Sequence, residues 1–398
     1  MERNQKENLM LMKKYQFNKK RKICVVTTTR AEYGQLRNLL FLIQKNKNLL
    51  LQLVVSGTHL SKSHGHTINE IYNDKIKINY RVNLDLKKFS PDSIALYTAV
   101  GLRKFTKCFK KLQPDIVLVL GDRYEIFSAA SATLFLGIPL AHIHGGEVTA
   151  GVIDESLRHS ITKMSDIHFV ASKVFQKRVI RMGENKTNVF NFGALTVENI
   201  QNIEFLNKKY LERKFRFKFL KNNFMISIHP ESSLENTVKI IKHTLISLKK
   251  LKDSLLIFTA PNSDAHSNVI VSYIKKFIIK NKNCVYFNNL GYRNFLSCLK
   301  ICKVLIGNSS SGVLEAPFLK VKSINIGNRQ DGRPILPGVI CCKINNIEID
   351  RAICNLYSTK NKKSYKLDHL KIQKTKFKIL QILKKIKLTN IKYKKFID

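Results

Sequence analysis

The chain has 398 residues, of which 44% are hydrophobic and 9% aromatic, with 17 Gly and 8 Pro. This composition excludes a wholly disordered or fibrous protein, because the apolar side chains can offset the entropy lost on folding, and the length predicts two domains. The formal net charge is +42, from 70 Lys plus Arg against 28 Asp plus Glu.

A charge of this size suits a nucleic-acid or anionic-membrane partner. The sequence is also rich in Ile and Asn, which together with Lys are the residues that AT-rich coding produces, and its lysines are spread along the chain. We therefore interpret the charge as compositional and expect no nucleic-acid partner and no membrane partner.

The chain shows no targeting or redox signature. No apolar run reaches the roughly 18 residues that span a bilayer, and the start, MERNQKENLMLMKKYQFNKK, lacks the apolar region of a secretory signal. The 8 Cys form no C-x-x-C pair, which favours reduced thiols over a zinc site or disulfides. We expect a cytoplasmic protein.

After a charged N-terminal extension, residues 1–20, strands and helices alternate over residues 21–198. The strands expected there are short and apolar throughout, as in a parallel sheet that is covered on both faces. They are Lys22–Thr28, Leu51–Ser56, Ile116–Leu120, Leu140–Ile143, Ile167–Ala171 and Asn188–Phe192. This region predicts an N-terminal Rossmann-like catalytic domain of the α/β class.

A polar, Lys-rich stretch, residues 199–223, predicts the linker, and the alternation restarts over residues 224–359 as a second Rossmann-like domain. Its expected strands are Phe224–Ile228, Leu255–Thr259, Cys284–Phe287, Val304–Ile306 and Ser323–Ile326, with helices at Thr237–Leu251 and Ser311–Leu319. Residues 360–398 predict a Lys-rich C-terminal helix packed on the body; a membrane-surface role is the alternative.

Polar and glycine-rich motifs follow the first-domain strands: TTTRAEYG, SGTHL, GDRYE and HIHGGEVTAGVIDESLRH. Loops at the carboxyl ends of parallel strands lie at one edge of the sheet, where ligands bind. Four such loops therefore predict a single polar site in the cleft between the two domains.

Candidate proton-transfer residues lie in the last two of these motifs. Asp122 leaves an apolar strand, so desolvation is expected to raise its pKa and suit it to proton transfer; helix N-capping is the competing role. His144 and Glu147 flank a Gly-Gly pair that allows close approach to a ligand. His142, which alternates with His144 on the strand, is as well explained as a core residue.

The segment DESLRHSITKM predicts a helix that begins with acidic residues, where the helix dipole favours them. Capping alone would explain Asp154. It does not explain Arg158 and His159, which place a cation and a titratable ring near the same end of the cleft.

The second domain carries the features of an anion and ribose site. In GNSSSGVLEAP, Ser309, Ser310 and Ser311 meet the start of a helix, where hydroxyl and backbone N–H groups can bind phosphate. Glu315 could accept hydrogen bonds from ribose hydroxyls. In GNRQDGR, the guanidinium groups of Arg329 and Arg333 match phosphate oxygens.

The motifs TTRAEYG, SGTHL, GDRYE, HIHGGEVTAGVIDESLRHSITK, GNSSSGVLEAP and INIGNRQDGR, in this order, closely resemble those of the hydrolysing UDP-N-acetylglucosamine 2-epimerases of sialic and related nonulosonic acid biosynthesis. The resemblance spans about residues 22–333. It implies two Rossmann-like domains facing a cleft, similar to GT-B glycosyltransferases, with a UDP-sugar as substrate and neither a cofactor nor a metal. We also expect a homo-oligomer.

The resemblance implies a reaction in which a base removes the C2 proton of the sugar while UDP departs from C1. Water then adds to the glycal-type intermediate at C1, a proton returns to C2, and N-acetylmannosamine and UDP are released. Asp122 and Asp154 match two family acids. Where the family pattern H-x-E-x-G has its third acid, this chain has His144, with Glu147 three residues on, so either residue could take that role.

Binding residues carry over from the family in the same way. Those that resemble family positions are Arg30 and His229 near the diphosphate, Ser309 and Ser310 in the phosphate loop, Glu315 at the ribose, and the distal Arg329. The remaining expected binding residues lie in the same motifs and strand-end loops: His59, Arg123, Arg158, His159, Asn262 and Ser311.

Three alternatives stay open. A related hydrolysing epimerase acts on UDP-N,N'-diacetylbacillosamine, and the motifs do not distinguish the sugar. Non-hydrolysing epimerases typically have G-T-R-P-E in the first loop, where this chain has Thr29, Arg30, Ala31, Glu32 and Tyr33. A GT-B glycosyltransferase would share the cleft but would need an acceptor.

Overall fold

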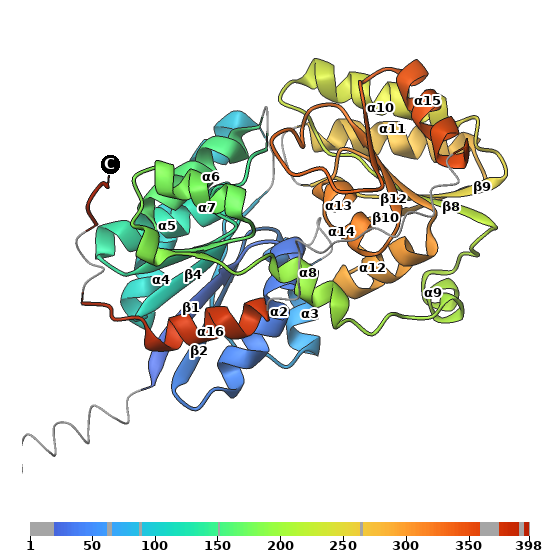
Figure 1. Cartoon of the computed structure of the whole chain (residues 1–398). Helices are drawn as coiled ribbons and strands as arrows, with labels where there is room; N and C mark the ends of the chain where they lie inside the picture. Colours follow the sequence, from blue (N-terminus) through green and yellow to red (C-terminus); the bar gives the residue numbers. More distant parts are fainter. Residues whose placement is uncertain are drawn as a thin grey trace, which may run out of the picture.

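Two parallel β-sheets, each with helices on both faces, form the described part of the chain (Figure 1). The computed structural model describes residues 20–61, 66–86, 90–149, 152–262, 266–358, 374–389 and 394–397. Residues 1–19 of the predicted extension and residues 359–373, which include the start of the predicted C-terminal helix, lie outside the described residues.

The first sheet has the order β3-β2-β1-β4-β5-β6-β7, and all of its pairings are parallel. Its strands are β1 (Arg21–Thr27), β2 (Leu49–Ser56), β3 (Ile78–Val82), β4 (Ile116–Leu120), β5 (Leu140–Ile143), β6 (Ile167–Val170) and β7 (Val189–Asn191). The six predicted strands are confirmed, and β3 is additional. Its sequence, INYRV, lacks an apolar run because β3 lies at the sheet edge and is only partly buried.

Alternate residues of the central strand β1 enter different cores, because successive side chains of a strand point to opposite faces. Ile23 and Val25 pack on one face with helices α2, α3, α8 and α16. Cys24 and Val26 pack on the other face with α4, α5 and α6.

The helices of this part are α2 (Arg30–Lys45), α3 (Ile68–Asn73), α4 (Pro91–Leu112), α5 (Tyr124–Leu136), α6 (Ile153–Met164), α7 (Lys173–Arg181) and α8 (Leu195–Gln201), with the 3-10 turns η1 (Gly57–Leu60) and η3 (Lys186–Asn188).

The second sheet has the order β10-β9-β8-β11-β12-β13 and is also parallel throughout. Its strands are β8 (Asn222–Ser227), β9 (Ser254–Thr259), β10 (Cys284–Phe287), β11 (Val304–Gly307), β12 (Lys322–Ile326) and β13 (Val339–Cys342). The edge strand β13 was not predicted, because VICC is short and half exposed. Helices α10 (Leu234–Leu248), α11 (Ser267–Lys280) and α15 (Asn346–Ser358) cover one face, and α9 (Lys208–Phe215), α12 (Tyr292–Ile301) and α14 (Glu315–Phe318) cover the other.

Two segments differ from the elements expected. The stretch predicted as a linker, residues 199–223, contains the end of α8 and the whole of α9, whose Leu211 is fully buried in the second core. The single helix expected at Ser311–Leu319 is instead two short helices, α13 (Ser310–Val313) and α14, which meet at Leu314. The break places Glu315 at the start of a new helix.

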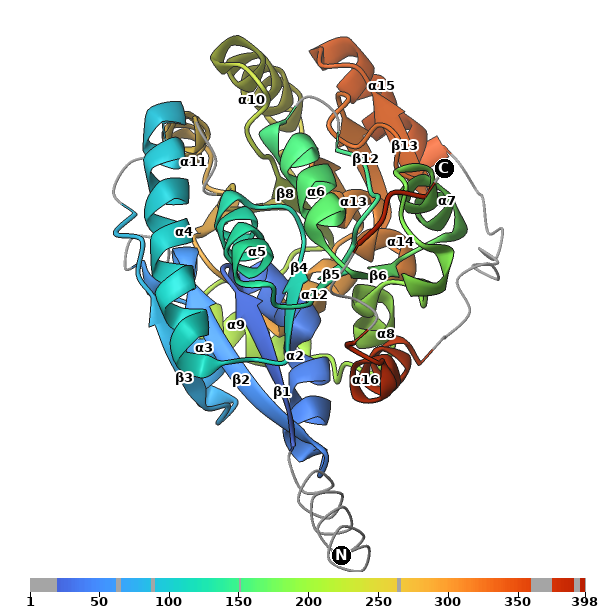
Figure 2. The ribbon, with the colours of Figure 1, turned by 90° about the vertical axis from the view of Figure 1, so that its left-hand side faces the viewer.

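The C-terminal helix α16 (Thr375–Lys385) returns to the first sheet and packs beside α2 and α8 (Figures 1 and 2). Ile379, Leu380 and Leu383 join the first core. At the two ends of the helix, Thr375 Oγ1 donates to Phe192 O at 2.6 Å and Arg21 Nη1 donates to Leu383 O at 2.8 Å. The predicted packing of a basic helix on the body is thus observed for residues 375–385.

Replacement of Leu383 by Ala is expected to destabilise the fold by about 2–4 kcal/mol, because it removes a fully buried side chain and leaves a cavity. Phe377→Ala on the same helix is the matched control: Phe377 is 45% exposed and its loss should cost less than about 1 kcal/mol. Urea denaturation followed by circular dichroism measures both variants. Equal losses would contradict this placement of α16.

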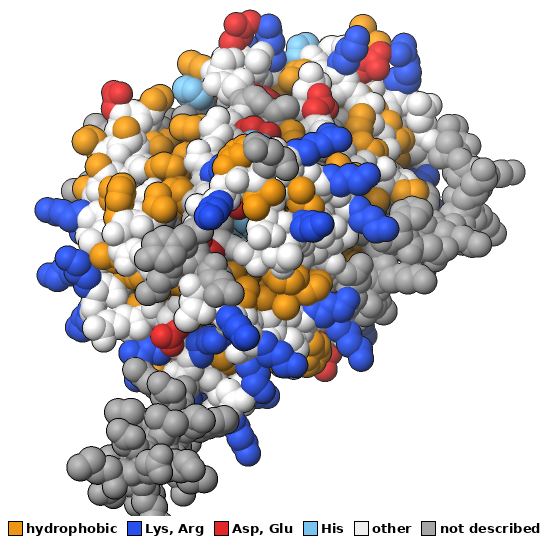
Figure 3. All heavy atoms as spheres, turned by 60° about the vertical axis from the view of Figure 1, so that its left-hand side comes forward, with side chains coloured by type: hydrophobic (Ala, Val, Ile, Leu, Met, Phe, Trp, Pro, Cys, Tyr) orange, Lys and Arg blue, Asp and Glu red, His pale blue; other side chains and the backbone are white. Residues whose placement is uncertain are grey.

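On the face shown in Figure 3, Lys and Arg side chains lie among hydrophobic and uncharged ones. All eight cysteines are free thiols, and five of them are buried. Within the described ranges, no helix is both long enough and apolar enough to cross a membrane.

Candidate active site

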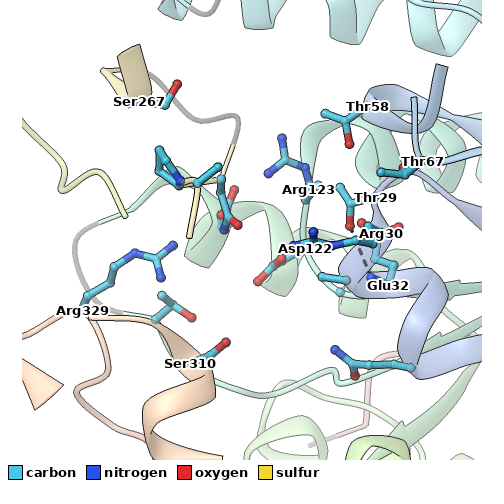
Figure 4. Close-up of a pocket in the computed structure, with 18 of the residues that line it drawn as sticks. Thr29, Arg30, Glu32, Thr58, Thr67, Asp122, Arg123, Ser267, Ser310 and Arg329 are labelled. Atoms are coloured by element: carbon cyan, nitrogen blue, oxygen red, sulfur yellow. Dashed lines mark hydrogen bonds between the residues drawn. The ribbon is translucent and has the colours of Figure 1, made fainter. Parts of the chain in front are cut away.

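A cavity of about 700 Å³ lies where the loops of the two sheets face each other. Figure 4 shows Arg30, Asp122 and Arg123 on one side of it, and Ser310 and Arg329 on the other. The predicted site residues that line it are Arg30, Asp122, Arg123, His144, Glu147, Asp154, Arg158, Asn262, Ser310, Glu315 and Arg329. Residues predicted from both halves of the sequence therefore share one cavity.

Asp122 follows β4 and pairs with Arg158 of α6. The Asp122 side chain is 23% exposed, whereas that of Arg158 is only 2% exposed. Helix α5 begins at Tyr124 with Arg123 at the N-cap, so Asp122 is not the capping residue. The buried guanidinium of Arg158 lies beside the Asp122 carboxylate and compensates its charge. The sequence analysis had expected Asp122 to be desolvated without such a partner.

Arg158 connects the loops that carry the other carboxylates. Its Nη1 donates to Glu147 O and Glu155 Oε2, both at 3.0 Å, and its Nη2 donates to Thr149 Oγ1 at 2.9 Å. Burial, followed by the nearby Arg333, lowers the pKa of Arg158 to about 9. Arg158 therefore remains a cation at neutral pH and holds the loop after β5 against Asp122.

His144 and Glu147 form a close pair. His144 Nδ1 lies 2.5 Å from Glu147 Oε1, and Glu147 Oε2 lies 3.5 Å from Arg333 Nη2. Burial alone would raise the pKa of Glu147, but His144 and Arg333 more than offset it, so the pKa is lowered. Glu147 is therefore a carboxylate, and its direct partner His144 lines the same cavity.

His142 is a core residue, which resolves one alternative left open by the sequence. It is fully buried, with Nε2 2.7 Å from Gly121 O and Nδ1 3.3 Å from Thr162 Oγ1. Burial lowers its pKa to about 3, so the ring is neutral. His144 differs because β5 ends at Ile143 and His144 has a φ of 69°, which turns it out of the strand.

The second-domain side of the cavity offers polar atoms that lack protein partners. Glu315 is 8% exposed and Arg329 is 6% exposed. Glu315 Oε2 and Arg329 Nε are buried and have no hydrogen-bond partner among the described residues. Burial raises the pKa of Glu315. Buried polar groups are normally paired, so a polar ligand in the cavity would give these two atoms partners.

Five predicted binding residues are not among those that line the cavity. His59 is fully buried between Thr27 Oγ1 at 3.1 Å and Thr67 Oγ1 at 2.7 Å, and burial lowers its pKa to about 3. His229 Nδ1 accepts from the backbone N–H of Asn262 at 3.0 Å, so it orients a loop that does line the cavity.

The other three predicted residues that do not line the cavity are His159, Ser309 and Ser311. His159 Nε2 lies 3.0 Å from Glu155 Oε1. Ser309 is the N-cap of α13, where its Oγ accepts from the Ser311 N–H at 3.3 Å. None of these three residues lines the cavity, although Ser309 and Ser311 flank Ser310, which does.

Several polar residues that line the cavity are not among those predicted: Thr29, Glu32, Gln35, Thr58, Thr67, Thr149, Tyr286, Asn288, Asn289 and Lys275. Thr29, Glu32 and Thr58 lie in the motifs after β1 and β2, so the strand-end signal could have found them. Asn288 and Asn289 follow β10, and Asn289 accepts a hydrogen bond from Arg30 across the cavity.

The motif residue Arg333 also lines the cavity, but its guanidinium is not directed at an open phosphate site. It donates instead to Val148 O and Thr149 Oγ1 of the first domain. Within the described ranges, no three His, Cys, Asp or Glu side chains are grouped so as to hold a metal ion.

A family model, curated relatives and solved structures were found that are similar to this chain. The model of the family described as UDP-N-acetylglucosamine 2-epimerase matches residues 42–384. A "GDP/UDP-N,N'-diacetylbacillosamine 2-epimerase (hydrolyzing)" from Campylobacter jejuni is 41% identical over 390 residues, covering 95% of this chain and 99% of the relative. A "UDP-N,N'-diacetylbacillosamine 2-epimerase (hydrolyzing)" from Legionella pneumophila is 33% identical, covering 92% of this chain and 97% of the relative.

Among solved structures, the Methanocaldococcus jannaschii UDP-GlcNAc 2-epimerase in complex with UDP-GlcNAc and UDP has a TM-score of 0.77 at 19% identity. The match covers 91% of this chain and 99% of that chain. This similarity confirms the predicted fold of two Rossmann-like domains facing a cleft.

Proposed function

Because this chain belongs to the family of hydrolysing UDP-N-acetylglucosamine 2-epimerases, we propose that it converts a UDP-2-acetamido sugar and water to the free 2-epimeric sugar and UDP. One observation carries the proposal. Asp122, Glu147 and Asp154 from the first sheet line the same cavity as Ser310 and Arg329 from the second. Proton-transfer groups thus face a site suited to a nucleoside diphosphate.

The chemistry needs a base near C2 of the sugar and cations near the departing diphosphate. In the first step, a carboxylate removes the C2 proton, the C1–O bond breaks, and UDP leaves with the bonding electrons to give a C1–C2 double bond. In the second step, water adds its hydroxyl at C1 and C2 receives a proton on the opposite face. Each positioned acid or base contributes on the order of 100 to 10,000-fold to the rate.

We assign the proton transfers to Asp122, Glu147 and Asp154. The Arg158 cation beside Asp122 and the lowered pKa of Glu147 support their action as carboxylate bases. Arg30 and Arg329, together with the phosphate loop at Ser310, would stabilise negative charge on the departing UDP. Glu315 would accept hydrogen bonds from the ribose hydroxyls through its unpartnered oxygen.

Two sugars are candidates, UDP-N-acetylglucosamine and UDP-N,N'-diacetylbacillosamine. The second is favoured by the names of the two relatives that are 41% and 33% identical. A cavity of about 490 Å³ adjoins the first and shares Glu147, Leu314 and Arg333 with it, and its surface is mostly apolar. Such a surface suits the C4 acetamido methyl and C6 methyl of bacillosamine better than hydroxyl groups.

Incubation with each sugar nucleotide in deuterated water, followed by NMR, tests the reaction. We expect release of UDP and deuterium at C2 of the 2-epimeric product, with a higher kcat/KM for the bacillosamine nucleotide. A product that retains the C2 hydrogen would contradict the mechanism, and a 2-epimer still bound to UDP would indicate a non-hydrolysing epimerase. The GDP-linked bacillosamine sugar run in parallel tests the choice of nucleotide.

A further inference from the structure

The turn after β12 links the nucleotide side of the cavity to the catalytic loop of the other domain. Arg329 of this turn lines the cavity, and the fully buried Gln330 donates from Nε2 to Asn308 O at 2.8 Å, next to the phosphate loop. Asp331 N–H donates to Asn328 O at 2.9 Å, and Arg333 N–H donates to Gln330 O at 3.2 Å. These backbone bonds make the turn a compact unit.

From this turn, Arg333 crosses to the first domain and contacts three consecutive residues. Its Nε donates to Val148 O at 3.1 Å, and its Nη2 donates to Thr149 Oγ1 at 3.2 Å. The same Nη2 lies 3.5 Å from Glu147 Oε2. With a side chain that is only 15% exposed, Arg333 is held by these contacts rather than by water.

The backbones approach closely at the same place. Gly332 has a φ of +80°, and a Cβ added there would lie 2.8 Å from Val148 Cγ1. A non-glycine residue would be strained in this conformation and would also press on Val148. Gly332 therefore allows the turn to lie against the catalytic loop.

The contact extends to a second carboxylate. Thr149 Oγ1 accepts from Arg333 and also from Arg158 Nη2 at 2.9 Å, and Arg158 pairs with Asp122. Arg333 thus touches Glu147 directly and reaches Asp122 through Thr149 and Arg158. Misplacement of a reacting group by about 1 Å can cost on the order of 100-fold in rate.

We propose that Arg333 is a positioning residue: from the nucleotide-binding domain it holds Glu147 in place. Binding of the diphosphate and positioning of the proton-transfer loop then depend on the same turn. This inference rests on the proposed function. It gives Arg333 a role distinct from that of Arg329, four residues earlier, which faces the nucleotide.

Arg333→Met is expected to lower kcat by about 10 to 100-fold while leaving the dissociation constant for UDP nearly unchanged. Loss of the cation also removes one cause of the lowered pKa of Glu147. The acidic limb of the kcat–pH profile should therefore move to higher pH. Arg333→Lys, which keeps the charge but loses the planar fork, should retain the pH limb and recover part of kcat.

Two further variants separate positioning from loss of a side chain. Gly332→Ala keeps Arg333, but its added methyl group would push the turn away from Val148, so it should lower kcat as Arg333→Met does. The double variant Gly332→Ala/Val148→Ala removes the side chain that this methyl group meets and should restore part of the rate. Arg351→Met is the control: Arg351 is 64% exposed and pairs with Glu348 on α15, and its removal should change neither kcat nor UDP affinity.

Steady-state kinetics and calorimetric UDP titrations of the full-length chain give the result. If Arg333→Met weakens UDP binding as much as it lowers kcat, or leaves kcat and the pH limb unchanged, the positioning role is wrong. A wild-type protein that binds UDP but releases none from either sugar nucleotide would instead contradict the proposed function. The two failures are therefore distinguishable.

Discussion

Asp122→Asn is expected to lower turnover by on the order of 100 to 10,000-fold while leaving UDP affinity nearly unchanged. The amide cannot take the C2 proton, but it keeps the shape of the side chain and an oxygen that accepts from Arg158. Arg158 also retains Glu155 Oε2 at 3.0 Å and Thr149 Oγ1 at 2.9 Å. The loss should therefore be one of chemistry rather than of structure.

UDP release under saturating sugar nucleotide measures turnover, and calorimetry measures UDP binding. Asp85→Asn is the matched control, because the Asp85 side chain is 64% exposed and Asp85 is not among the residues that line the cavity. Its partners are Lys104 Nζ at 3.6 Å and Asn83 Nδ2, which donates to Asp85 Oδ1 at 2.7 Å. Deuterium incorporation at C2 should fall in parallel with turnover. An Asp122→Asn enzyme that still exchanges C2 hydrogen at the wild-type rate would refute the assignment.

Arg158→Met is expected to destabilise the fold by about 3 kcal/mol and to abolish measurable turnover, because it leaves Asp122 and Glu155 without their shared cation. Arg158 is 2% exposed, so water cannot replace the guanidinium. Arg158→Lys restores the charge, but the lysine ammonium group cannot reach the same four acceptors. The stability of this variant should lie between those of Arg158→Met and the wild type.

Urea denaturation of each variant measures the free energy of unfolding. Arg293→Met is the matched control: its side chain is 50% exposed, its partner Glu204 is 92% exposed, and such surface pairs contribute about 0–1 kcal/mol. If both substitutions cost the same, the buried network does not hold the loop as described. A stable, inactive Arg158→Met protein would show that the network serves catalysis alone.

Strands in the interior of the two sheets could be predicted because burial on both faces leaves a continuous apolar run in the sequence, as in IVLVL of β4. Of the four edge strands, β7 and β10 were predicted, whereas β3 and β13 were not, because a strand paired on one side needs no such run. The break at Leu314 was missed although the sequence carries a signal for it. GVLEAP has an apolar pattern compatible with one helix, but Pro317 lacks the N–H that a continuous helix would bond to Val313 O.

The site shows the same division. Its loops could be found because carboxyl ends of parallel strands converge in any such fold, and eleven of the predicted residues line one cavity. The sequence does not distinguish His59 and His142 from His144, since each is a histidine in or beside a buried strand. Whether the ring meets Thr27 and Thr67, Gly121 O or the cavity depends on the residues packed against it.

The sequence by itself determined the α/β class, the two repeats of alternating elements and the chemical types gathered at the strand ends, because these depend on local apolar patterns and on motif order. Only the tertiary structure decided that Arg158 lies between Asp122 and Glu155, and that Arg333 of one domain contacts Glu147 of the other. Glu147 and Arg333 are 186 residues apart in the chain. Their meeting depends on how two separate sheets face each other, which no local pattern encodes.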